Sequence, residues 1–293
     1  MAINSDARVR QLMHAGDQGA WINAALALAL DDRGPEAHRL AAADVLRSLE
    51  IDVDTDLGEL DRGAVAAQAA APLLQTAALI RGDGQLWQGQ SDEALLAQGR
   101  ASAQGAASMA RFGLPSLPGL AEALARPGAM MLDVGTGVAA MAVAYAELFP
   151  ELTVVGLDVL PRVLALAAST VAASDVADRV VLREQDVATL DEEGTYAFAW
   201  LPAPFVPEAA LLAGIPRVAR AMSPGGWVML GHGRFTEGSA DNAITRFKTV
   251  AYGGTPLDDE QAERLLRDAG LQGVTTLPTP PGSPALTVGR KSE

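Results

Sequence analysis

The segment that decides the fold is MLDVGTGVAAMAVAYAELFPELTVVGLDVLPR, residues 131–162. Its first apolar run reaches Asp133, and the chain then turns at Gly135 and Gly137. A helical stretch follows, and a second apolar run ends at Asp158. This order predicts a strand, a glycine turn, a helix and a second parallel strand, in which the glycines let the backbone approach a ligand closely.

The same alternation continues through the C-terminal half of the chain. Strand-like runs fall at 129–134, 152–157, 180–183, 197–201 and 227–230, with helical patterns at 139–148, 161–173 and 208–222 between them. After a further helical pattern, the short runs 273–277 and 285–288 should pair as an antiparallel hairpin at the sheet edge. We therefore expect an α/β fold, a doubly wound sheet with an antiparallel edge hairpin.

The first part of the chain has a different character. It is rich in alanine and helical in period up to about residue 125. Two helical patterns precede ALIRGDGQLW, residues 78–87, where Asp83-Gly84 indicates a hairpin turn. Helix, helix and hairpin together are typical of a winged helix. Pro127-Gly128 marks the expected boundary between a helical, winged-helix-like domain at 1–127 and the α/β domain at 128–293.

Composition excludes several classes of protein. The formal net charge of −14 disfavours nucleic acid as a partner, and the absence of cysteine excludes disulfides and thiolate metal sites. The longest apolar candidate, residues 20–30, is shorter than the roughly 20 residues of a membrane span and lacks the flanks of a signal peptide. We expect a cytoplasmic chain without a membrane contact.

An acidic run at residues 52–63 resembles the start of a calcium loop. However, Leu57 stands where such a loop needs its glycine, and Gly63 stands where it needs a bidentate glutamate. We interpret this run as a solvated loop and expect no metal.

The glycine turn fits two kinds of cofactor. Read as Gly135-x-Gly137-x-x-Ala140 with Asp158 about twenty residues later, it fits a dinucleotide fingerprint, so an NAD-dependent oxidoreductase is one alternative. Asp133 disfavours that reading, because a carboxylate there would repel a pyrophosphate and attract a ligand that carries an ammonium and a sulfonium.

Two later segments add to the pattern. Gln185-Asp186-Val187 follows the third strand, where a carboxylate can receive an adenine amino group. Ser223-Pro224-Gly225-Gly226 forms the turn before the fifth strand. With these motifs in this order, the segment from about 128 to 290 resembles class I S-adenosylmethionine-dependent methyltransferases, which have a Rossmann-like sheet.

The resemblance implies a cofactor and a set of residues that bind it. The cofactor is S-adenosyl-L-methionine, and alanine replaces the third glycine of the family's motif at position 139. The implied cofactor-binding residues are Asp133, Gly135, Thr136, Gly137, Asp158, Val159, Gln185, Asp186, Val187 and Leu201.

The N-terminal part more loosely resembles the winged-helix region that precedes this core in many small-molecule O-methyltransferases. There it builds a homodimer and roofs the substrate, so the resemblance implies a homodimer that acts on a small organic acceptor. A non-catalytic S-adenosylmethionine-binding regulator that uses its winged helix on DNA or a partner protein is a further alternative. The negative charge of the chain disfavours DNA.

The residues that face the acceptor are harder to assign. Residues 200–208, WLPAPFVPE, lack the polar residue of amine and amide methyltransferases and the catalytic histidine of plant-type O-methyltransferases. Methylation at oxygen therefore rests on another group, and His232 at the end of the fifth strand is the candidate base. Trp200, Phe205 and Phe235 are the candidate substrate contacts. A histidine bonded at the sheet rim and ordinary core packing are the competing explanations.

Overall fold

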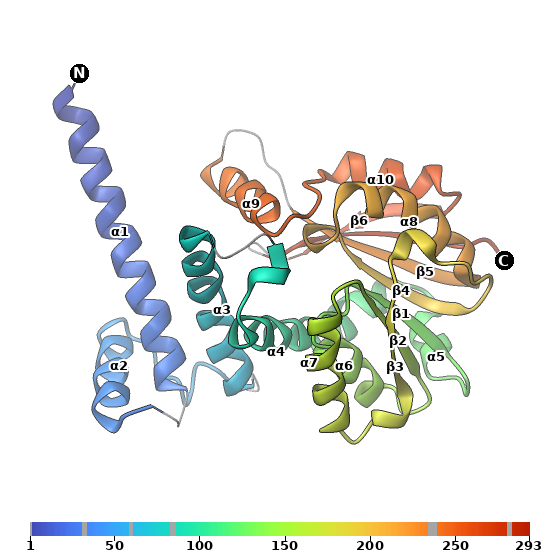
Figure 1. Cartoon of the computed structure of the whole chain (residues 1–293), viewed down its shortest axis with the longest axis horizontal. Coiled ribbons are helices and arrows are strands. Elements are labelled where there is room, and N and C mark those ends of the chain that lie inside the picture. The colour runs from blue at the N-terminus through green and yellow to red at the C-terminus, as the bar shows by residue number, and fades with distance from the viewer. Residues whose placement is uncertain (1, 31–33, 59–60, 83–85, 234–238, 280–282) are drawn as a thin grey trace. The chain divides into compact units, whose positions relative to one another are not determined.

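The computed structural model describes residues 2–30, 34–58, 61–82, 86–233, 239–279 and 283–293 (Figure 1). Contacts divide the chain into two compact units, which are described separately. The first unit comprises Met1–Gly84 and Gln90–Gln104, and the second comprises Gln85–Gly89 and Gly105–Glu293. Residues 105–127 thus pack with the second unit. The domain boundary expected at 127/128 stays a prediction.

The second unit is built on one mixed sheet of seven strands. They are β1 (Met130–Val134), β2 (Thr153–Asp158), β3 (Val180–Glu184), β4 (Tyr196–Pro202), β5 (Met222–His232), β6 (Gln272–Leu277) and β7 (Ala285–Arg290). Their order is β3-β2-β1-β4-β5-β7-β6, and the first five are parallel. Strand β7 runs antiparallel to both β5 and β6. The predicted α/β fold with an antiparallel edge hairpin is confirmed.

Helices cover both faces of this sheet, as Figure 1 shows. The covering helices are α5 (Leu120–Leu124), α6 (Ala140–Leu148), α7 (Pro161–Ala172), α8 (Glu208–Ala221) and α10 (Asp259–Asp268), and the unit also contains α9 (Ala240–Ala251). Alternation along the strands gives each face its own core. On one face Met131, Phe198 and Met229 pack with α5, α6 and α7. On the other, Leu132 and Leu230 pack with α8 and α10. Burial on both faces explains why the strands are almost continuously apolar.

Within its described residues, the regular elements of the first unit are all helices, and residues 49–58 form turns between two of them. It contains α1 (Ala2–Ala29), α2 (Glu36–Ser48), α3 (Arg62–Arg81) and the larger part of α4 (Asp92–Ser108). The Asp61 carboxylate caps α3 by accepting a hydrogen bond from the Ala64 amide at 2.6 Å. Ala67, Ala71 and Ala97 form a small buried cluster between α3 and α4. The helical N-terminal region is therefore confirmed.

The hairpin predicted at residues 78–87 is wrong in the part that the structure describes. Helix α3 continues to Arg81, and Gly82 ends it with a left-handed φ of 73° and an amide that donates to the Ala78 and Leu79 carbonyls. Residues Leu86–Gly89 then form a 3₁₀ helix, η1. The glycine read as part of a hairpin is thus a helix stop. The turn residues Asp83 and Gly84 lie outside the described residues.

Helix α3 also corrects the prediction that residues 20–30 are the longest apolar segment. Its stretch of uncharged residues is longer than the run at 20–30, and by length and composition it is the one described helix that could cross a membrane. The core helices of many proteins pass the same test. The side chain of Gln75 on α3 donates to Gln98 on α4 at 2.9 Å, a contact that suits a helix packed within a protein.

Candidate active site

The glycine turn lies at the carboxyl edge of the sheet, between β1 and β2. Gly135 and Gly137 have φ values of 65° and 59°, a region that side chains with a Cβ rarely adopt. The intervening Thr136 amide donates to the Leu157 carbonyl at 2.9 Å, which fixes the turn against the end of β2. A Cβ added at Gly137 would meet no atom closer than 4.0 Å, so the turn leaves open backbone for a ligand.

Asp133 is buried beneath this turn. Only 2% of its surface is exposed, and its carboxylate accepts a hydrogen bond from the Thr136 hydroxyl at 2.7 Å. Burial raises the pKa of Asp133 to about 7; the Thr136 hydrogen bond lowers it and the charge of Asp158 raises it further. At neutral pH this carboxyl is therefore close to its own titration point. The side chain is thus covered by the turn, whereas the sequence pattern predicted that it would face the cofactor's cation.

Gly156 makes room for that arrangement from the neighbouring strand. A Cβ added to Gly156 would lie 2.7 Å from the Thr136 hydroxyl oxygen and 2.9 Å from both of that side chain's carbons. The absence of a side chain on β2 at this position thus allows Thr136 to point down onto Asp133.

Asp158, at the end of β2, joins the turn to the next helix. One carboxylate oxygen accepts from the Gly137 amide at 3.0 Å and the other from the Leu160 amide at 3.0 Å. Burial raises its pKa, and these backbone hydrogen bonds lower it. A carboxylate offers about four acceptor positions, so the oxygens retain capacity for ribose hydroxyls. The neighbouring Val159 is 55% exposed.

The segment after β3 lies next to Asp158. The Gln185 amide donates to the Asp158 carbonyl at 3.0 Å. The Asp186 carboxylate accepts from the Ala188 amide at 2.8 Å, so it caps a short 3₁₀ turn. Val187 is buried against Gly214 of α8, where an added Cβ would lie 2.7 Å from it. Asp186 and Gln185 therefore remain the members of this segment whose side chains can approach an adenine.

Trp200 and Leu201, near the end of β4, point to opposite faces of the sheet. Leu201 is fully buried in the core under α8 and α10. Trp200 lies on the other face, where its backbone pairs with Asp133 of β1, and its ring covers Gly231 of β5. A Cβ on Gly231 would come within 2.4 Å of that ring. Trp200 thus lies on the same face of the sheet as Asp133, whereas the Leu201 side chain is buried in the opposite core.

Phe205 belongs to an aromatic cluster that sequence reasoning identified only in part. Its ring packs at 5.2 Å against both Trp87 and Tyr252, and the latter two stack at 5.3 Å. Trp87 was missed because it lies far away in the sequence, in a segment interpreted as a hairpin arm. Phe235 lies outside the described residues.

His232 lies on the opposite face from Asp133 and Trp200, in line with Leu230. It has no exposed surface; its Nδ1 is 2.9 Å from the Gly233 carbonyl, and its Nε2 is 2.7 Å from the Thr287 hydroxyl. Burial lowers its pKa, although hydrogen bonds and nearby acids raise it. In this arrangement neither ring nitrogen is available to an acceptor hydroxyl, and the role of His232 as a base stays a prediction.

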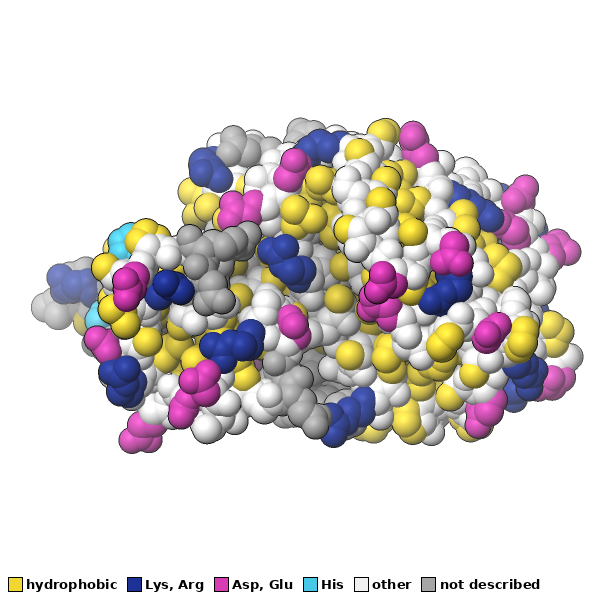
Figure 2. Space-filling model, turned by 90° about the horizontal axis from the view of Figure 1, so that it is seen from below, with side chains coloured by type: hydrophobic (Ala, Val, Ile, Leu, Met, Phe, Trp, Pro, Cys, Tyr) yellow, Lys and Arg dark blue, Asp and Glu magenta, His cyan; other side chains and the backbone are white. Residues whose placement is uncertain are grey.

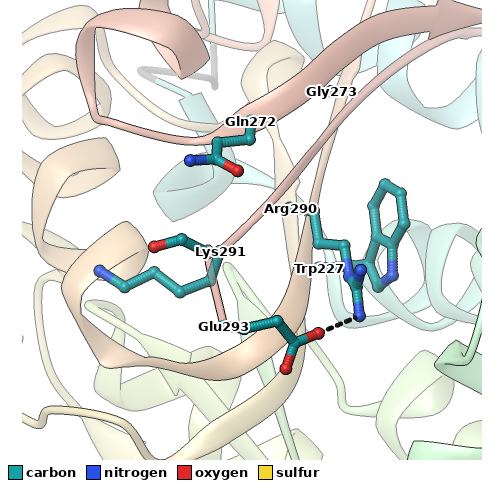
Figure 3. Close-up of a pocket in the computed structure, with 7 residues that line it drawn as sticks. Trp227, Gln272, Gly273, Arg290, Lys291 and Glu293 are labelled. Atoms are coloured by element: carbon teal, nitrogen blue, oxygen red, sulfur yellow. Dashed lines mark hydrogen bonds and ion pairs between the residues drawn. The ribbon is translucent and has the colours of Figure 1, made fainter.

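A shallow pocket of about 260 Å³ opens toward the amino ends of the parallel strands, where β7 ends beside Trp227 of β5 (Figure 3). Arg290 lies over the Trp227 ring at 5.9 Å and pairs with Glu293. Because ligands of open α/β sheets bind at the carboxyl ends of the parallel strands, this pocket is not the cofactor site.

The comparisons with known proteins agree with this geometry. A family model described as a methyltransferase domain matches residues 131–226. No curated protein matches the chain.

Solved structures resemble the chain over nearly its whole length. An O-methyltransferase family protein from Burkholderia thailandensis is 18% identical, with 98% of each chain covered and a TM-score of 0.63. Human N-acetylserotonin methyltransferase in complex with SAM is 14% identical, with 99% of this chain and 98% of that chain covered and a TM-score of 0.67. The pyocyanin biosynthetic protein PhzM is 15% identical, with 99% and 100% covered and a TM-score of 0.65.

At these identities the structures show a shared fold, and the family match gives the chemistry. The open glycine turn, the acid at the end of β2 and the polar segment after β3 suit a nucleoside with an amino-acid tail. The chain carries a class I S-adenosylmethionine-dependent methyltransferase domain, and its cofactor is S-adenosylmethionine.

Proposed function

We propose that the chain transfers the methyl group of S-adenosylmethionine to a hydroxyl oxygen of a small organic acceptor. The observation that carries the proposal is the extent of the fold similarity. It includes the helical N-terminal region as well as the sheet, and two of the similar proteins are described as an O-methyltransferase and as human N-acetylserotonin methyltransferase.

The segment after β4 supports oxygen as the site of methylation. Residues 203–207, APFVP, contain no side chain that could hold an amide or an exocyclic amine by hydrogen bonds. Nor does this described segment contain an acid or a base. The cofactor supplies a methyl group that its sulfonium has already activated, so the chain's main task is to hold an acceptor oxygen in line with it. Because this segment supplies no base, the site suits an acidic hydroxyl such as that of a phenol, which can ionise in water before it binds.

We also propose that the chain forms a homodimer through its first unit. Four large apolar side chains on α1 are between 53% and 74% exposed: Val9, Leu12, Met13 and Trp21. Apolar surface of this kind on one helix is typical of a protein contact. The DNA-binding alternative has less support, because basic and acidic side chains are interspersed among the described residues on the face seen in Figure 2.

The test of oxygen methylation uses S-adenosylmethionine labelled with ¹³C at the methyl group. We would offer matched ring pairs that differ only in hydroxyl against amino, such as 4-fluorophenol and 4-fluoroaniline, and read the methylated atom from the ¹³C chemical shift. We expect label on oxygen and none on nitrogen. Label on nitrogen alone would contradict the proposal.

The control is Asp158→Ala, which removes a charged hydrogen-bonding group from the cofactor site. It should weaken binding of S-adenosylhomocysteine by about 2–3 kcal/mol and lower transfer to every acceptor alike.

A further inference from the structure

Trp87 comes from the N-terminal half of the chain but packs within the second unit. The short segment Gln85–Gly89 joins that unit, although residues on both sides of it belong to the first. Trp87 stacks on Tyr252 with an angle of 23° between the rings and meets Phe205 edge-on at 70°. Three distant segments therefore form one aromatic cluster, which comprises Trp87, Phe205 and Tyr252.

The backbone holds this cluster firmly. The Thr255 amide donates to the Ala203 carbonyl at 2.8 Å, and the Thr255 hydroxyl donates to the Val206 carbonyl at 2.9 Å. Gly254 lies so close to the segment after β4 that an added Cβ would be 1.9 Å from the Pro204 carbonyl oxygen. The segments that carry Phe205 and Tyr252 are thus fastened together, and these two rings are preorganised.

The cluster also lies beside the glycine turn. A Cβ added to Gly135 would be 3.8 Å from the ring of Pro202, the last residue of β4. Phe205 follows Pro202 by a single 3₁₀ turn, η6 (Ala203–Phe205). The aromatic cluster therefore begins where the cofactor's turn meets the end of β4, which is where an acceptor has to lie.

The indole nitrogen of Trp87 is unusual in this setting. It is buried and makes no hydrogen bond to any residue that the structure describes. Buried indole N–H groups normally have a partner, because an unmade hydrogen bond costs free energy. The Trp227 nitrogen, for example, donates to the Pro118 carbonyl at 3.4 Å. An acceptor oxygen that displaces the groups covering Trp87 would satisfy this donor.

We infer that Trp87 positions the methyl acceptor: its N–H donates to an oxygen of a planar, apolar acceptor that lies against Phe205 and Tyr252. The inference rests on the proposed function, because it concerns the acceptor of that same reaction. It assigns a specificity-determining role to a residue outside the methyltransferase sheet. Tyr252 suits the site as well, since burial raises the pKa of its hydroxyl and keeps it neutral.

The experiment uses a pair of probes with the same ring, 4-fluorophenol and 4-fluorotoluene, which carry a hydroxyl and a methyl group of similar size. Their binding to the full chain with saturating S-adenosylhomocysteine is measured by ¹⁹F NMR. We expect wild type to prefer 4-fluorophenol by about five- to tenfold, the range of one ordinary hydrogen bond. The Trp87→Phe variant keeps a ring but no N–H, and we expect it to bind both probes within twofold of each other.

Two control variants separate the hydrogen bond from ring packing. Phe205→Leu removes an aromatic wall and leaves the donor, so it should weaken both probes equally and preserve their ratio. Trp227→Phe changes a tryptophan at the opposite edge of the sheet and should alter neither affinity. A preference for the phenol that survives in Trp87→Phe overturns the inference, and so does a wild type that binds neither probe or does not distinguish them.

A second measurement avoids any change at position 87. The chain has four tryptophans, so the indole N–H signals of ¹⁵N-labelled wild type can be assigned with Trp21→Phe, Trp200→Phe and Trp227→Phe variants. The Trp87 signal should move downfield with 4-fluorophenol and not with 4-fluorotoluene; equal movement overturns the inference. If the wild-type chain does not bind S-adenosylhomocysteine, the result would instead contradict the proposed function.

Discussion

At the scale of single residues, the candidate cofactor site depends on the contact between Gly156 and Thr136. Gly156→Ala would place a methyl group 2.7 Å from the Thr136 hydroxyl and push that side chain away from Asp133. We expect a loss of about 1–3 kcal/mol in the free energy of unfolding, the usual cost of overpacking, together with weaker binding of S-adenosylhomocysteine.

The matched control for this variant is Val155→Ala on the same strand. Val155 is buried on the other face of β2, so its truncation lowers stability without touching Thr136. Calorimetry should show normal S-adenosylhomocysteine affinity in Val155→Ala and reduced affinity in Gly156→Ala. Equal affinities in the two variants would mean that Thr136 does not shape the site.

The raised pKa of Asp133 makes the free energy of unfolding depend on pH. Its pKa rises from 3.8 to about 7 on folding, so the folded chain keeps a proton that the unfolded chain releases. Its stabilising contribution is therefore complete below pH 4 and is lost as pH rises through about 7. Asp133→Asn removes this dependence, because an amide can still accept from Thr136. Urea unfolding should show wild type losing stability relative to Asp133→Asn between pH 5 and 8; parallel profiles would refute the shift.

At the scale of elements, His232 links strands and a helix. Its Nε2 contacts the Thr287 hydroxyl of β7, which lies 2.8 Å from the Thr276 hydroxyl of β6. Thr276 in turn donates through its amide to the Glu263 carboxylate of α10 at 3.1 Å. This chain of contacts ties the end of β5 to the sheet edge and to α10.

We therefore expect His232→Ala and Thr287→Val each to destabilise the fold by about 1–3 kcal/mol, because each takes a hydrogen bond away from a buried partner. The double variant should lose less stability than the sum of the two single losses, since both substitutions remove the same contact. Chemical denaturation measures all three. A fall in kcat of a hundredfold or more in His232→Ala, with stability unchanged, would instead support the catalytic base expected from the sequence.

Local signals explain which elements could be predicted from the sequence. The glycine turn, the parallel strands and the edge hairpin follow from short-range patterns, and they are confirmed. The face of the sheet on which His232 lies could also have been predicted from the sequence, because residues 228, 230 and 232 alternate with 227, 229 and 231 along β5. The packing of Trp87 could not be predicted in this way, since its partners at 205 and 252 come together only through tertiary packing. The prediction of a hairpin at residues 78–87 was wrong because a glycine such as Gly82 ends a helix as readily as it forms a turn.

At the scale of the whole molecule, the proposed homodimer makes a direct prediction. Light scattering at micromolar concentration should give about twice the 30.3 kDa mass of one chain. Leu12→Glu together with Trp21→Glu replaces two of the exposed apolar side chains of α1 with charges and should yield monomers. Leu212→Glu, on α8 of the second unit, is the control for an added exposed charge and should leave the dimer intact. Wild type that stays monomeric at every concentration would contradict the proposal.

The position of β7 between β5 and β6 has a consequence for how the chain is made. A ribosome releases β6 before β7, yet β6 reaches the sheet only through β7. Until residues 285–290 emerge, β6 has no strand to pair with and the outer side of β5 is an open edge, the kind of surface that recruits strands from other chains. Translation at about 5–20 residues per second keeps that interval short, so a pause between the emergence of β6 and that of β7 would prolong the exposure of this edge.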